Sequence, residues 1–98
     1  MITATMIIER TDSLVNQTSV FLAEINNRTY PDVVELAKWK YLTISLIESF
    51  PISNTTKTDI LELFRQFDML SPNTVTLKII KGYLEGIKDD ILYYGDVD

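Results

Sequence analysis

The chain has 98 residues, which is enough for one domain with a single modest core and too few for two. It contains no cysteine and no histidine, so disulfides, thiolate metal sites and histidine general bases are excluded. The formal net charge of −5 argues against a surface that binds nucleic-acid phosphates directly. Because 46% of the residues are apolar, the composition is that of a folded globular protein.

No segment indicates export or contact with a membrane. The apolar N-terminal run lacks a basic leader and ends at Glu9 and Arg10, too early for a signal peptide. Nowhere does a run of about 18 apolar residues occur, which is the length that spans a bilayer. We therefore expect a cytoplasmic location.

Residues 5–27 form the first predicted helix. Leu14, Thr18 and Phe21 recur at the spacing of one helical face. Its start is open, because residues 1–8 alternate in a way that is also typical of a short strand. Helix, strand and disorder all remain possible there.

Residues 31–50 form the second predicted helix, which is apolar around nearly its whole circumference. Proline suits the first position of a helix, so we place the start at Pro31. The helix ends at Phe50, because Pro51 disfavours helical geometry in the residue before it. A helix that is apolar on every side is typically surrounded by others. We therefore predict that this helix is the central element, with Trp39 in the core.

Two further helices are predicted over residues 56–69 and 72–94. One of several threonines caps the first, and Ser71 followed by Pro72 is a strong signal for the start of the second. Four helices with short connections favour an all-α fold. The prediction is a single domain, residues 1–98, folded as a mainly antiparallel four-helix bundle.

The last predicted helix carries two series of residues on opposite sides. The inward series has a heptad-like spacing and should face the core; it consists of Leu77, Ile80, Leu84, Ile87, Ile91 and Tyr94. The outward series consists of Val75, Ile79, Gly82, Gly86, Asp89 and Tyr93. Each glycine costs about 1 kcal/mol relative to alanine inside a helix, which suggests that something packs close to the backbone there. Either another helix of the same chain covers the glycines, or they are merely tolerated, or they form a docking face for a second subunit or a partner protein.

Acidic residues gather at the C-terminal end of the chain. From Glu85 onward there are five acidic residues and one basic residue, Lys88. This end is either a solvated tail that aids solubility or, with Tyr93 and Tyr94, a patch that meets a basic protein surface.

No catalytic or metal-binding pattern is present. Glycine-rich phosphate loops, nucleophile elbows and calcium loops are all missing from the sequence. Carboxylate pairs such as Asp59 with Glu62 lie on polar helix faces, where solvated carboxylates are the usual finding. We expect no enzymatic activity, no metal and no cofactor.

The leading functional hypothesis is a non-enzymatic, protein-binding module that neutralises or inhibits its partner. In size, charge and helicity the chain resembles immunity proteins, antitoxins and phage or mobile-element inhibitors, although no motif identifies a family. Pediocin-type bacteriocin immunity proteins are similar four-helix bundles of comparable length, but are often basic. The alternative is a homo-oligomeric structural or assembly subunit joined through Gly82 and Gly86.

The expected partner is a protein with a basic surface, with no direct contact to nucleic acid or membrane and with a homodimer as a further possibility. The predicted contact residues are Val75, Ile79, Gly82, Gly86, Asp89, Asp90, Tyr93, Tyr94 and Asp96.

Overall fold

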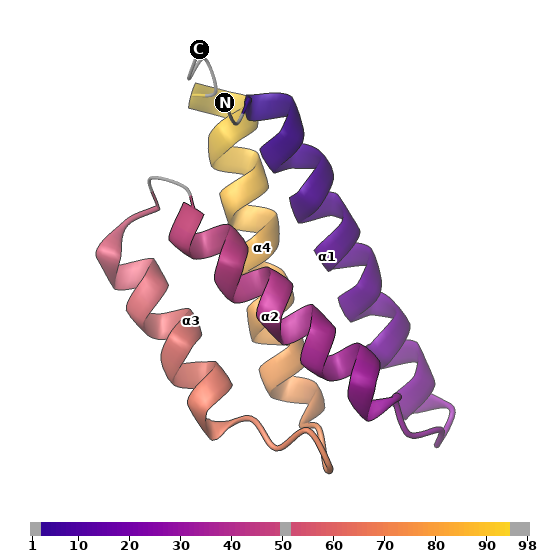
Figure 1. Cartoon of the computed structure of the whole chain (residues 1–98). Coiled ribbons are helices and arrows are strands. Elements are labelled where there is room, and N and C mark those ends of the chain that lie inside the picture. Colours follow the sequence, from indigo (N-terminus) through magenta and orange to yellow (C-terminus); the bar gives the residue numbers. More distant parts are fainter. Residues whose placement is uncertain (1–2, 50–51, 95–98) are drawn as a thin grey trace.

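The computed structural model describes residues 3–49 and 52–94, with the side chain of Tyr94 left out. It contains four helices: α1 (Ala4–Asn26), α2 (Val33–Ser49), α3 (Asn54–Gln66) and α4 (Thr74–Tyr94). No strand occurs in the described ranges. In Figure 1 the chain runs down α1, up α2, down α3 and up α4. The predicted all-α, single-domain, four-helix fold is confirmed.

Helices α2 and α4 begin two residues later than predicted, and in both cases for the same reason. Asp32 accepts a hydrogen bond from the backbone N–H of Val34 at 2.7 Å, and Asn73 accepts one from that of Val75 at 2.8 Å. Each is therefore the capping residue, because its side chain satisfies an N–H that has no partner inside the helix. The proline lies just before the cap in each case, so placing Pro31 and Pro72 at the first helical position was wrong.

The other two helices are capped by hydroxyls. Thr3 accepts from the N–H of Met6 at 3.2 Å, so the chain is helical from Ala4, which decides between helix and strand for the described part of residues 1–8. Ser53 accepts from the N–H of Thr56 at 3.2 Å and thus caps α3, where a threonine cap was expected. Helix α3 ends at Gln66, three residues before the predicted end, because the next residue has extended backbone angles.

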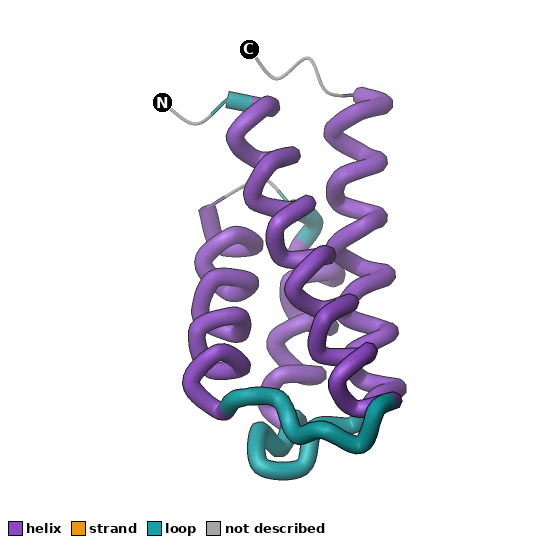
Figure 2. Tube along the Cα trace, turned by 90° about the vertical axis from the view of Figure 1, so that its right-hand side faces the viewer, coloured by secondary structure: helices purple, strands orange, loops and turns teal. Residues whose placement is uncertain are grey.

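The helices follow one another around the bundle. Helix α1 packs most extensively against α4, and the other neighbouring pairs are α1 with α2, α2 with α3, and α3 with α4. Helices α1 and α4 are also the longest, with 23 and 21 residues. Figure 2 shows that their ends extend beyond the end of α2 and the start of α3. One end of the bundle is therefore a pair of helices rather than four.

Trp39 lies at the centre of the core and is 1% exposed. Its ring makes edge-to-face contacts with Phe21 and Phe64, with centroids 5.6 and 5.3 Å apart. Its indole N–H donates to the hydroxyl of Thr18 at 2.9 Å, and that hydroxyl in turn donates to the carbonyl of Leu14 at 2.7 Å. A buried indole N–H needs such a partner. The predicted core role of Trp39 is confirmed.

Helix α2 is not surrounded by the other helices, so its prediction as the central element is wrong. Its buried residues, which include Leu36, Trp39 and Ile47, lie on one face. On the opposite side Val34 is 68% exposed and Tyr41 is 64% exposed. Among the described elements α2 has α1 and α3 as its neighbours, which leaves an apolar outer face in solvent. The predicted last residue, Phe50, lies outside the described residues.

Candidate functional site

The described members of the inward and outward series of α4 lie where the sequence predicts. Leu77, Ile80 and Leu84 are completely buried against the rest of the bundle. On the other side Val75, Ile79 and Tyr93 are exposed. We call the surface made by Val75, Ile79, Gly82, Gly86, Asp89 and Tyr93 the outward face of α4. It is an apolar strip of a long helix that points into solvent.

The two glycines on this face are open. A Cβ atom built on Gly82 or on Gly86 would have no heavy atom within 4 Å outside its immediate helical surroundings. The possibility that another helix of the same chain packs against them is therefore wrong for the described part of the chain. Both glycines therefore lower the stability of the helix, and no contact with another part of the described chain compensates for this loss.

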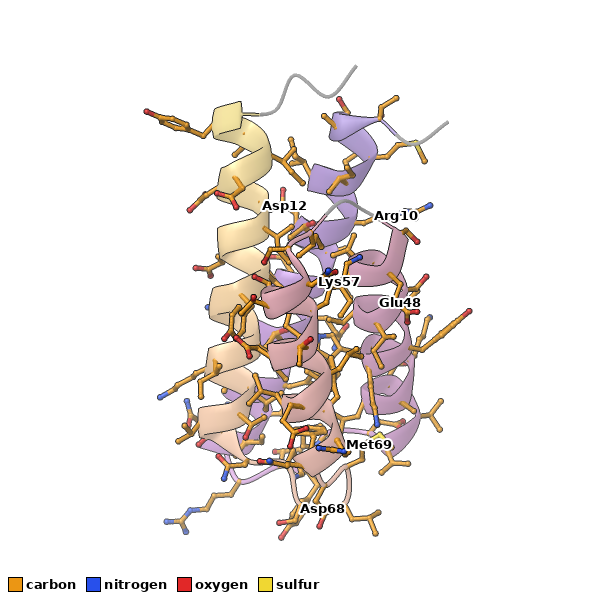
Figure 3. All side chains as sticks on the ribbon, turned by 90° about the vertical axis from the view of Figure 1, so that its left-hand side faces the viewer. Arg10, Asp12, Glu48, Lys57, Asp68 and Met69 are labelled. Atoms are coloured by element: carbon orange, nitrogen blue, oxygen red, sulfur yellow. The ribbon has the colours of Figure 1, made fainter. Side chains whose placement is uncertain are left out.

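A groove of 580 Å³ lies along one edge of the outward face. We call it the α4 groove; its lining residues are Ile7, Ile52, Ser53, Thr56, Ile79, Gly82, Tyr83, Gly86, Ile87, Asp90 and Ile91. They come from the start of α1, the start of α3 with the residues before it, and the C-terminal half of α4. The groove exists because α3, at about 20 Å, is shorter than α4, at about 32 Å. Figure 3, in which α3 faces the viewer, shows α1 and α4 rising past the start of α3.

The chemistry of the groove is mostly aliphatic, with a few placed polar groups. The hydroxyl of Tyr83 donates to the carboxylate of Asp59 on α3 at 3.1 Å. This hydrogen bond raises the pKa of Tyr83 above its ordinary value. Ser53 and Thr56 satisfy each other, with their hydroxyl oxygens 2.8 Å apart. Asp90 forms no hydrogen bond or ion pair among the described residues, so its carboxylate is available to a ligand.

The cation nearest to this acidic end is turned away from the groove. The ammonium of Lys88 lies 2.5 Å from a carboxylate oxygen of Asp12 on α1. Asp12 projects from α1 toward α4 (Figure 3). The hydrogen bond to Asp12 raises the pKa of Lys88, and partial burial opposes the shift. Asp89 and Asp90 are exposed, so their carboxylates give this end of α4 a negative charge.

The structure brings some of the predicted contact residues together and separates others. Ile79, Gly82, Gly86 and Asp90 line the α4 groove, whereas Val75, Asp89 and Tyr93 lie beside it on the outward face. The side chain of Tyr94 and the whole of Asp96 lie outside the described residues.

The residues that form the walls of the groove could not be predicted from the sequence. Ile7 and Ile52 come from other parts of the chain, and nothing in their local sequence pairs them with α4. Tyr83 belongs to neither the inward nor the outward series, so helical periodicity alone assigned it no role.

The predicted carboxylate pairs are engaged in other interactions or lie in solvent. Glu62 binds the guanidinium of Arg65 and also accepts from the side-chain amide of Gln66. Asp59, the other carboxylate of this candidate pair, accepts a hydrogen bond from the hydroxyl of Tyr83. The described residues contain no cluster of carboxylates placed to hold a metal ion. None of the helices in the described part of the chain combines the length and hydropathy needed to span a bilayer.

A comparison with protein-family models found no matching family, and searches of curated proteins and of solved structures found no significant match.

Proposed function

We propose that this chain is a non-enzymatic, protein-binding module that neutralises or inhibits its partner through the outward face of α4 and the α4 groove. The observation that carries the proposal is the open backbone at Gly82 and Gly86, in the middle of an exposed apolar strip. Glycine inside a helix is destabilising, and the close approach of another backbone or of a ligand is a physical reason for a chain to keep it there. Since no such contact occurs within the described chain, we infer that a partner supplies the close approach to the glycine backbone.

The partner presents an aliphatic helix or loop edge with a basic residue beside it. The isoleucines and glycines of the groove match aliphatic side chains, and Asp90 offers an unused carboxylate at its rim. The neighbouring Asp89 adds a second exposed negative charge. Charges of this kind, placed at the rim of an apolar contact, speed the capture of a partner of opposite sign.

The test compares two leucine substitutions at exposed helix positions. Gly86→Leu fills the groove, while Ala37→Leu places the same side chain on the exposed outer face of α2. A partner captured from the native host is identified and purified, and its binding to each variant is measured by surface plasmon resonance. We expect Gly86→Leu to abolish both binding and inhibition of the partner, and Ala37→Leu to preserve both. Equal binding by the two variants would overturn the proposal.

The charge component is tested separately. Replacing Asp89 and Asp90 with Asn should slow association and flatten its salt dependence, with little effect on dissociation, because exposed charges act mainly on encounter. Measuring the association rate at two ionic strengths shows this directly. An unchanged salt dependence would place the contact away from the acidic end of α4.

A further inference from the structure

We propose that, without its partner, the chain pairs with a second copy of itself through the outward face of α4, with the two helices antiparallel. The inference rests on the proposed function, because it concerns the same face. It assigns a regulatory role to self-association: the dimer hides the surface that the partner needs, and the partner must displace the second copy.

The spacing of the outward face is self-complementary when one copy is reversed. From Val75 to Tyr93 its residues are spaced by four, three, four, three and four positions, which is the spacing of a two-helix seam. With the centre of the pair midway between the glycines, Gly82 lies opposite Gly86 of the second copy. In the same register Val75 lies opposite Tyr93 of the second copy. Apolar residues thus meet at both ends, Ile79 lies opposite Asp89 of the second copy, and small residues meet in the middle, where two backbones can come closest.

Charge favours this register as well. Lys78 and Asp89 project from the same edge of the outward face, and the antiparallel register sets Lys78 beside Asp89 of the second copy. The two-fold symmetry makes this pair twice. Neither residue forms an ion pair within the described chain. A parallel pair would instead bring the two copies of Asp89, which belongs to the seam, to the same level and leave both copies of Lys78 away from them, which is repulsive.

One like-charge contact limits the affinity of the dimer. Glu85 lies beside Glu85 of the second copy, close to the two-fold axis. The ammonium of Lys81, which is 3.9 Å from the carboxylate of Glu85 in the same chain, partly offsets the repulsion. The face of a single helix is also smaller than a standard interface of about 1,600 Å². Both features predict a weak dimer that dissociates on dilution, as displacement by a partner requires.

The first test uses the oligomeric state of the purified chain, measured by sedimentation over a range of concentrations. We expect a monomer–dimer equilibrium. Lys78→Glu and Asp89→Lys, each alone, should weaken the dimer roughly tenfold, because each turns two attractive pairs into repulsive ones. The double variant should recover the wild-type affinity. Lys38→Glu, an exposed charge reversal on α2, is the control and should have no effect.

The second test determines whether the two copies of α4 pair in antiparallel or in parallel. The chain has no cysteine, so single cysteines can be introduced without interference. In the antiparallel register the two copies of residue 75 are about 27 Å apart, too far for a disulfide, whereas residues 75 and 93 of different copies are in reach. Under mild oxidation we expect Val75→Cys and Tyr93→Cys to stay uncrosslinked alone and to crosslink when mixed.

The outcomes separate this inference from the proposed function. A chain that stays monomeric up to about 1 mM, the range of very weak association, overturns self-pairing and leaves partner capture untouched. Crosslinking of Val75→Cys with itself overturns the antiparallel register. Partner bound to an intact dimer overturns the regulatory role. Conversely, if Gly86→Leu abolishes the dimer but still binds the partner, self-pairing stands and the proposed contact site fails.

Discussion

Replacing the helical glycines of α4 with alanine should stabilise the protein. Neither Gly82 nor Gly86 has a positive φ, and the Cβ added at either would meet no neighbouring atom within 4 Å. The substitution therefore removes the helix penalty of glycine, about 1 kcal/mol at each position, without a steric cost. For a domain of this size 1 kcal/mol raises the midpoint of thermal unfolding by about 4–8 °C. We expect the double variant to gain about 2 kcal/mol.

The assay is urea and thermal unfolding followed by circular dichroism at 222 nm, in solutions dilute enough to keep the chain monomeric. Ala37→Gly on the exposed face of α2 is the matched control and should lose about 1 kcal/mol, since it reverses the same change in a similar setting. If either alanine variant is destabilised while the control behaves as expected, the glycines contact another part of the chain. The stability cost of the glycines would then be explained by a contact within the chain and not by an intermolecular one.

Three further predictions concern the core and one ion pair. Leu84→Ala should cost about 2–5 kcal/mol in urea unfolding, because the side chain is completely buried, and a loss below 1 kcal/mol would contradict the assigned packing. Thr18→Val removes the acceptor for the indole N–H of Trp39 and should cost about 1–3 kcal/mol, with a change in tryptophan fluorescence; unchanged stability would show that this hydrogen bond is not needed. The pKa of Lys88 is raised in the folded chain, so the pairing of Lys88 with Asp12 stabilises the fold. This stabilisation is fully present below the ordinary lysine pKa of 10.5, and it is lost as the pH rises through the higher pKa of the folded chain. Asp12→Asn should flatten the fall in the urea midpoint over that alkaline range, and an unchanged profile would contradict the pairing.

The helical periodicity of α1 and α4 could be predicted from the sequence, and it placed their core residues correctly. Leu14, Phe21 and Leu84 recur at helical spacing, and all three are buried. This works because the 3.6-residue repeat sets which side chains share a face, whatever the helix packs against.

The helix starts were less predictable, because two local signals competed. Pro31 and Pro72 each favour the first helical position, but an Asp or Asn follows each of them. The side-chain oxygens of Asp32 and Asn73 accept hydrogen bonds from the backbone N–H groups of Val34 and Val75, so the residue after each proline caps the helix. A short polar residue after the proline therefore outweighs the proline as a start signal in this chain.

The sequence by itself determined the number of helices, their inward faces and the acidic end of α4, because these depend on local spacing and composition. Only the tertiary structure decided what each remaining face meets. An apolar circumference predicted a surrounded α2, yet α2 has two neighbours, because the helices follow one another around the bundle. The exposure of Gly86 and the groove beside it depend on how far α4 extends past the start of α3, which is a relation between distant segments. The spacing of residues along one helix contains no information about where another helix begins.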